Sequence, residues 1–178
     1  MAVELLFPFI FDHDRWDLLR RLPEEDKANL LELAKCMKYI FGRNGHNGSL
    51  VVVGGVLDSR KTMPRKDIDL VSVFEQPFQN VVQGSRASVK VADAEYIVFR
   101  RLMRETSEKC GFKILEEISP GGDTASGTED LLGRRGSVVI KPGDGIQIDV
   151  ILHEGIGLKQ FKQTEGFHKH KHLVFASW

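Results

Sequence analysis

The sequence predicts an α+β fold, with some α/β character, in which helices pack on a β-sheet. Short apolar runs typical of buried strands alternate with two long segments of helical periodicity, and no linker or internal repeat interrupts this order. At 178 residues the chain has the length of one domain with a sizeable core. We therefore expect a single domain over 1–178, with its core at about 50–152, N-terminal helices at 14–42 and a C-terminal extension at 153–178.

Two segments have the spacing of amphipathic helices. The first follows Pro23, whose acidic successors favour a helix start, and it ends at Gly42. The second runs from about Val91 to Cys110, directly before Gly111. The buried side of the first is expected to hold Leu30, Leu33, Ala34, Met37, Ile40 and Phe41. The buried side of the second is expected to hold Ala94, Ile97, Val98, Leu102 and Met103.

Apolar runs between these helices predict the strands of the sheet. They lie at 50–53, around Ile68 and Leu70, at 112–118, at 137–140 and at 146–152. The last two runs flank Pro142–Gly145, whose composition is typical of a hairpin turn. Residues 119–136 are too rich in Gly, Ser, Thr and Asp to belong to the core, and the sequence leaves open whether they cover a site.

The most informative stretch joins a glycine pair to a pair of aspartates. Gly54-Gly55 ends the first strand, and glycine lets backbone N–H groups approach a phosphate closely. Asp67 and Asp69 alternate with apolar residues, so a strand places both carboxylates on one face. Two neighbouring acids repel each other unless a cation lies between them, and carboxylate oxygens suit hard ions such as Mg²⁺.

This pattern resembles the nucleotidyltransferase superfamily, which includes DNA polymerase beta, CCA-adding enzymes and antibiotic nucleotidyltransferases. The family motif is a hydrophobic residue, Gly, and Gly or Ser, followed after roughly a dozen residues by Asp, a hydrophobic residue, Asp or Glu, and a hydrophobic residue. Here Val53-Gly54-Gly55 is separated by eleven residues from Asp67-Ile68-Asp69-Leu70. The amino-acid sequence of this segment is most similar to those of the CCA-adding and antibiotic-modifying branches, although the chain is shorter than either.

The resemblance implies the nucleotidyltransferase fold, a mixed β-sheet with helices packed mainly on one face. It also implies a third carboxylate on a strand beside the aspartate pair. Asp149 is the best candidate, because it alternates with apolar residues in its strand. Asp144 is the rival candidate, but it lies in the predicted turn. By the resemblance, Asp67, Asp69 and Asp149 are the catalytic and metal-binding residues, and they hold two Mg²⁺ ions, with Mn²⁺ as an alternative.

The implied reaction is transfer of a nucleoside monophosphate from a nucleoside triphosphate, such as ATP, to a hydroxyl, with release of pyrophosphate. The residues assigned to nucleotide binding are Gly54, Gly55, Ser59, Arg60 and Lys66. The acceptor stays open between a small molecule, an RNA 3′ end and a protein hydroxyl, and so do the nucleotide preference and the oligomeric state. The alternative interpretation is a nucleotide-binding or structural module that has the same fold and no catalytic activity.

Composition and charge limit the binding partners and the cellular location that we expect. Lys plus Arg equals Asp plus Glu at 25 each, so no general basic field indicates long nucleic acid as a partner. The apolar runs are too short to span a bilayer, and the N-terminus lacks the features of a signal peptide. We therefore expect a cytoplasmic protein without a membrane partner.

Two further groups of residues, the two cysteines and three histidines near the end of the chain, have side chains of types that can bind a metal ion. Cys36 and Cys110 lack metal-binding spacing, and we expect them to be free, buried thiols. An extended segment would place His168, His170 and His172 on one face. A metal site is one interpretation of these histidines, and a solvated basic edge or tail is the favoured one.

Overall fold

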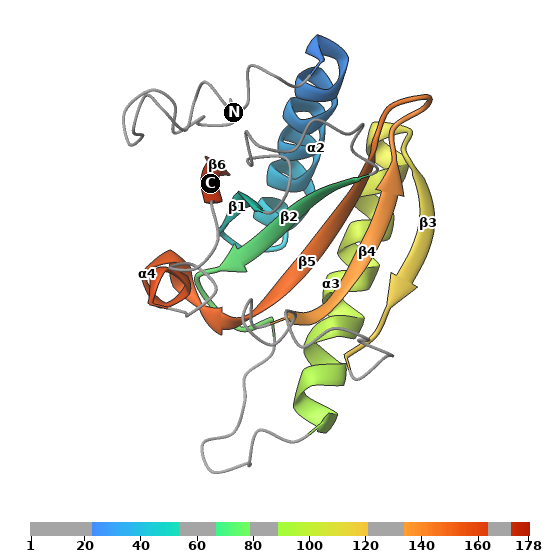
Figure 1. The fold of residues 1–178 in the computed structure, drawn as a ribbon. Coiled ribbons are helices and arrows are strands. Elements are labelled where there is room, and N and C mark those ends of the chain that lie inside the picture. Colours follow the sequence, from blue (N-terminus) through green and yellow to red (C-terminus); the bar gives the residue numbers. More distant parts are fainter. Residues whose placement is uncertain (1–22, 54–66, 79–88, 121–133, 164–171) are drawn as a thin grey trace.

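The protein is described here from a computed structural model. The structure describes residues 23–53, 67–78, 89–120, 134–163 and 172–178 (Figure 1). The helix expected to begin at 14 and the segment 121–133 lie outside these residues.

The described residues form one mixed sheet in the strand order β3-β4-β5-β2-β1-β6 (Figure 1). β2 and β5 run parallel, whereas all other neighbouring strands are antiparallel. The strands are β1 Gly48–Val53, β2 Asp67–Phe74, β3 Lys113–Ile118, β4 Arg134–Lys141, β5 Gln147–Ile156 and β6 His172–Ser177. The predicted mixed sheet is therefore confirmed, and β4 and β5 form the expected hairpin, each longer than its apolar run.

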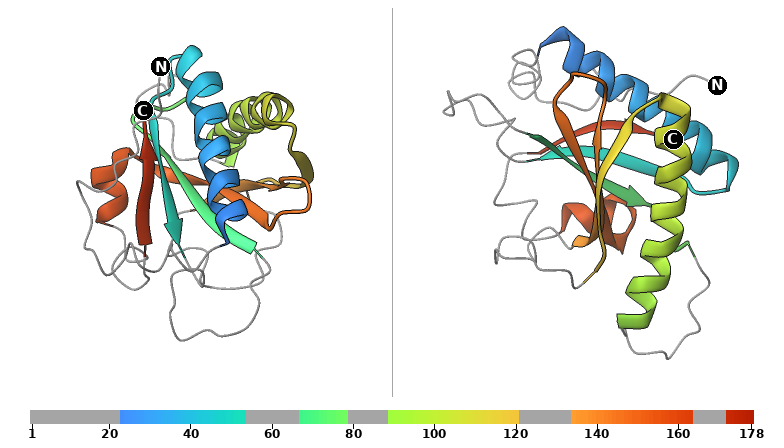
Figure 2. Two further views of the ribbon diagram at one scale, coloured as in Figure 1. Left: turned by 90° about the horizontal axis from the view of Figure 1, so that it is seen from above. Right: turned by 90° about the vertical axis from the view of Figure 1, so that its right-hand side faces the viewer.

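The helices lie mainly on one face of this sheet, as predicted. Seen from above in Figure 2, α2 (Glu24–Arg43) and α3 (Val89–Cys110) cover one face, and the short α4 (Gly157–Lys162) lies on the other. The main apolar core fills the space between α2, α3 and the sheet. The six residues predicted for the buried side of α2 are all buried. The second, smaller apolar cluster lies beneath α4 and consists of Val51, Val53, Val71, Val73, Ile151, Phe161 and Val174.

The predicted buried side of α3 was partly wrong. Leu102 and Met103 are fully buried, but 53% of the surface of Ile97 is exposed. The aromatic residues Tyr96 and Phe99 occupy the core-facing positions instead. Because neighbouring residues on a helix point about 100° apart, choosing the aliphatic Ile97 over Tyr96 rotated the predicted face by one position.

The prediction of free thiols was also wrong. Cys36 of α2 and Cys110 of α3 form a disulfide, with their Cα atoms 6.2 Å apart. That separation is normal for a disulfide. The two cysteines are 74 positions apart in the sequence, and only the side-by-side packing of α2 and α3 brings them together.

The prediction of a solvated edge or tail fails for His172. This residue begins β6, which pairs with β1 at the edge of the sheet, and its side chain is buried. His168 and His170 lie outside the described residues. The sequence analysis did not predict β6, because a polar run precedes it and its apolar residues begin only at Leu173.

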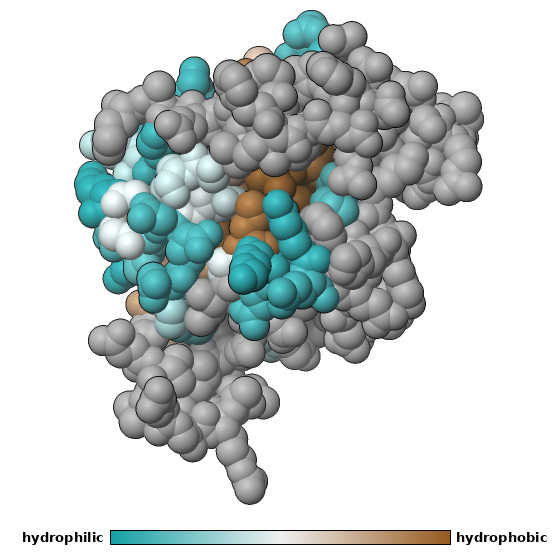
Figure 3. Space-filling model, turned by 90° about the vertical axis from the view of Figure 1, so that its left-hand side faces the viewer, coloured by the Kyte–Doolittle hydropathy of each residue, from teal (hydrophilic) through white to brown (hydrophobic). Residues whose placement is uncertain are grey.

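Figure 3 shows one face of the molecule, on which an apolar area borders hydrophilic side chains. None of the helices in the described part of the chain combines the length and the apolar character that crossing a bilayer requires.

Candidate active site

Two carboxylates predicted from the sequence lie side by side in the sheet. Asp69 of β2 and Asp149 of β5 are direct register partners on neighbouring parallel strands. Neighbouring strands are about 4.8 Å apart, so the two side chains leave the backbone next to each other. Asp67 precedes Asp69 by two residues on β2 and pairs with Gln147 of β5.

All three aspartates project from the face of the sheet opposite α2 and α3. Their neighbours Ile68, Leu70, Ile148 and Val150 belong to the main core on the α2 and α3 side. Side chains alternate between faces along a strand, so the aspartates point the other way, toward the side of α4. This packing explains why the three aspartates share one face, as predicted. If either strand shifted its register by one residue, its aspartate side chains would point into the core.

The aspartates differ in how far the protein encloses them. Asp67 is exposed at the start of β2, whereas Asp69 and Asp149 are partly buried. The Oδ1 atom of Asp149 is fully enclosed. We call Asp67, Asp69 and Asp149 the aspartate row, or the row. The row is therefore open to solvent at Asp67 and more enclosed toward Asp149.

The glycine pair follows directly from the strand beside Asp69. Val53 ends β1 and is the antiparallel register partner of Asp69. In the sequence, Gly54 comes next. The predicted nucleotide-binding residues Gly54, Gly55, Ser59, Arg60 and Lys66 lie outside the described residues.

The aspartates suit a divalent cation by their chemistry. Adjacent carboxylates repel each other, and a hard cation between them removes that repulsion and accepts their oxygens as ligands. In the described part of the chain, one group of three His, Cys, Asp or Glu side chains has its ligand atoms within 4.8 Å of one another. This group is Glu32, Cys36 and Cys110, and its two cysteines are disulfide-bonded. The ligand atoms of the three aspartates are more spread out, so binding of one ion by all three would require their side chains to turn toward it.

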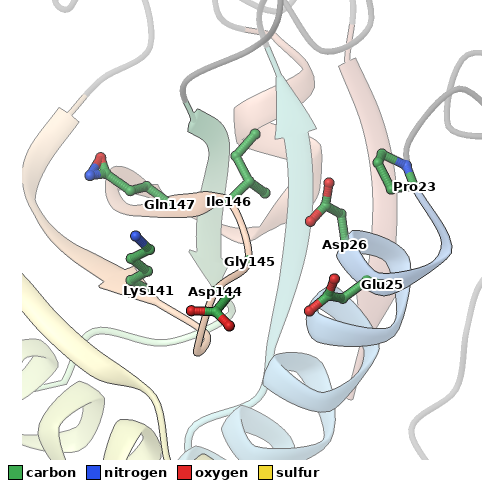
Figure 4. A pocket seen from close by; sticks show the side chains of 8 residues that line it. All are labelled: Pro23, Glu25, Asp26, Lys141, Asp144, Gly145, Ile146 and Gln147. Carbon is green, nitrogen blue, oxygen red and sulfur yellow. The ribbon is translucent and has the colours of Figure 1, made fainter.

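Asp144, the rival to Asp149, is not part of the row. It is exposed in the turn between β4 and β5 and lines a cavity of about 590 Å³ (Figure 4). The other lining residues are Pro23, Glu25, Asp26, Lys141, Gly145, Ile146 and Gln147. The volume lies in the range of small-molecule sites. Gln147 is also the register partner of Asp67, but Asp67 itself does not line the cavity.

The sequence analysis did not place two polar residues, Gln147 and His172, near the aspartates. Gln147 precedes Asp149 by two positions, so the alternation that selected Asp149 also places Gln147 on the same face. His172 lies two strands away from Asp69, beside Val53. No sequence signal locates His172 there, because its position depends on β6 pairing with β1.

The chain matches no protein-family model and no curated protein sequence. Its structure is similar to that of terminal uridylyl transferase 4 from Trypanosoma brucei, which was solved with bound UPU. The TM-score is 0.46 at 15% sequence identity, and the match covers 84% of this chain and 42% of the uridylyl transferase. The chain therefore spans less than half the length of that protein. The function proposed below depends on the residues of this chain alone.

Proposed function

We propose that the protein is a Mg²⁺-dependent nucleotidyltransferase that transfers a nucleoside monophosphate from a nucleoside triphosphate to a hydroxyl, with release of pyrophosphate. The observation that carries this proposal is the register of Asp69 beside Asp149, with Asp67 on the same face. Acids held together at the end of a sheet are costly without a cation, and an all-oxygen ligand set suits Mg²⁺.

In this proposal Asp67, Asp69 and Asp149 hold the divalent cations, with Mn²⁺ as a substitute for Mg²⁺. Bound there, the metal neutralises phosphate charge and stabilises the entering and leaving oxygens of an in-line displacement. The acceptor oxygen forms a bond to the α-phosphorus, and the bond from that phosphorus to the bridging oxygen breaks, so that pyrophosphate leaves. Asp149, the more enclosed acid, takes the proton of the acceptor hydroxyl.

The donor nucleotide occupies the side of the row nearest β1. Gly54 and Gly55 follow Val53, the neighbour of Asp69, and their N–H groups bind phosphate oxygens in this proposal. Ser59, Arg60 and Lys66 supply further hydrogen bonds and positive charge to the same phosphates. The acceptor is a small molecule, an RNA 3′ end or a protein hydroxyl, and the reaction takes place in the cytoplasm.

One observation favours a second candidate function, a nucleotide-binding module without turnover. The oxygens of the three aspartates do not converge within 4.8 Å in the structure, as the ligand atoms of a formed metal site would. Such a module binds the nucleotide through the same face but transfers nothing. The two candidates differ in one measurable property, the release of pyrophosphate.

The test is a transfer assay with nucleoside triphosphates labelled at the α-phosphate, Mg²⁺, and separate pools of RNA, protein and small-molecule acceptors. We expect label in one pool, and a loss of roughly a hundredfold or more in Asp69→Asn, because the metal contributes several kcal/mol to the transition state. Asp144→Asn is the matched control, since it removes an exposed aspartate outside the row. Wild-type rates in Asp69→Asn contradict the proposal, and nucleotide binding without label transfer supports the inactive module.

A further inference from the structure

His172 lies at the same level of the sheet as Asp69 and Asp149. It pairs with Val53, Val53 pairs with Asp69, and Asp69 pairs with Asp149. Four neighbouring strands, β6, β1, β2 and β5, thus carry these residues at one level. This level of the sheet therefore has two carboxylates at one end and an imidazole at the other.

The side chain of His172 points to the same face as the aspartates. Leu173, the next residue, belongs to the main core beneath α2 and α3. Val174 belongs to the smaller cluster on the side of α4. Alternation along β6 therefore places His172 with Val174, on the face that carries Asp69.

The burial of His172 sets it apart from a solvated surface charge. Only 5% of its surface is exposed. An imidazole offers N–H donors, and phosphate oxygens are strong acceptors for them. In a poorly hydrated setting such hydrogen bonds are stronger than they are in water.

We infer that His172 binds the terminal phosphates of the nucleoside triphosphate, a role that rests on the proposed function. In this inference the α-phosphate lies beside Asp69, and the remaining phosphates run past Val53 toward His172. Two strand spacings, about 10 Å, separate the backbone of His172 from that of Asp69. His172 is thus a substrate-binding residue for the triphosphate part of the nucleotide.

His153 provides a matched control. It is also buried and lies on the same face as Asp149, beyond Ile151 on β5. Its ring packs edge-on against Phe161 of α4, with the ring centroids 4.9 Å apart. His153 is therefore a comparable histidine that lies outside the row, and its loss should not alter phosphate binding.

The test is a calorimetric titration of the full chain with a nucleoside triphosphate and with the matching monophosphate, each with Mg²⁺. In His172→Leu, which lacks a donor, we expect the Kd for the triphosphate to rise about tenfold, as for one lost charge-assisted hydrogen bond. His172→Gln retains one donor and should lose less. The Kd for the monophosphate should not change in either variant, and His153→Leu should bind both ligands as the wild type does. Circular dichroism verifies the fold, and His172→Gln gives the answer if His172→Leu unfolds.

Three results would overturn the inference: unchanged triphosphate binding in both His172 variants, equal losses for triphosphate and monophosphate, or no triphosphate binding by the wild-type chain. The transfer assay separates this failure from failure of the proposed function. If Asp69→Asn is inactive while the His172 variants bind normally, only the role of His172 is wrong. If Asp69→Asn retains transfer while His172→Leu loses triphosphate affinity, the catalytic assignment is wrong and the phosphate site stands.

Discussion

Tyr96 is the residue that most clearly links the stability of this fold to pH. Its ring is 2% exposed, and its hydroxyl donates a hydrogen bond of 2.9 Å to the backbone oxygen of Ser137. Gly136 makes room for the ring, since a Cβ atom there would lie 2.6 Å from Tyr96 Cδ2. Burial, followed by the negative charge of Glu117, raises the pKa of Tyr96 to about 12.

The raised pKa predicts a loss of stability in alkali. In the unfolded chain a tyrosine loses its proton near pH 10, whereas folded Tyr96 holds it to about pH 12. Its contribution to stability is therefore complete below about pH 10 and decreases as the pH rises toward 12. Tyr96→Phe lacks this contribution and, near neutral pH, loses about 1 kcal/mol with the hydrogen bond to Ser137.

Urea unfolding of both proteins between pH 8 and about 11.5 checks this prediction. The difference in unfolding free energy between the wild type and Tyr96→Phe should shrink above about pH 10. Lysines that titrate in the same range are present in both proteins, so their effect cancels in the difference. A difference that stays constant across the range contradicts the assignment to Tyr96.

At the scale of elements, the pairing of β2 with β5 holds the candidate site together. These parallel strands carry all three aspartates. The buried hydroxyl of Ser72 in β2 donates a hydrogen bond of 2.7 Å to the backbone oxygen of Ile151 in β5. This side-chain bond adds to the ladder between the strands and helps to fix the register on which the position of Asp69 beside Asp149 depends.

The pair α2 and α3 is held by contacts of a different kind. Besides the disulfide between Cys36 and Cys110, Lys109 Nζ lies 4.0 Å from the ring centroid of Tyr39. On the same ring, the guanidinium carbon of Arg43 lies 5.2 Å from the centroid, but this contact lies within α2. Cation–π contacts at exposed positions contribute about 0.5–1 kcal/mol each. The covalent link is therefore the main constraint at this exposed end of the two helices.

Removing the disulfide should lower the free energy of unfolding by about 2–4 kcal/mol, because the unfolded chain gains the freedom of a long open loop. Cys110→Ser is the better variant, since Cys110 is only partly buried whereas Cys36 is enclosed. Chemical denaturation with and without reductant provides the measurement. Reductant should destabilise the wild type to the level of Cys110→Ser and leave that variant unchanged. Two titratable thiols in the native, oxidised protein would rule out the disulfide.

At the scale of the whole molecule, local patterns determined most of what could be predicted. The alternation of Asp67 and Asp69 with Ile68 and Leu70 fixed their common face without knowledge of any neighbour. The same reasoning applied to Asp149. That the strands carrying them are adjacent came from the resemblance to nucleotidyltransferases, because strand order is a tertiary property that a single sequence does not encode locally.

Two of the features that sequence reasoning missed depend on distant segments meeting. The disulfide requires α2 to pack beside α3, and the burial of His172 requires the end of the chain to return to β1. The error at Ile97 has a different origin, since hydropathy alone does not distinguish an aliphatic residue at the boundary from an aromatic residue in the core. The segment 54–66, which holds the predicted phosphate-binding residues, lies outside the described residues.

The central claim is that Asp69 and Asp149 act as one ligand set for a divalent cation. Electron paramagnetic resonance of Mn²⁺, added with a nucleoside triphosphate whose α–β bridge resists cleavage, tests it most directly by distinguishing the protein-bound ion from the ion on free nucleotide. We expect the protein-bound signal in the wild type and in Asp144→Asn, and its loss in Asp69→Asn and in Asp149→Asn. An unchanged signal in either row variant would contradict the claim that these two strands share a metal site.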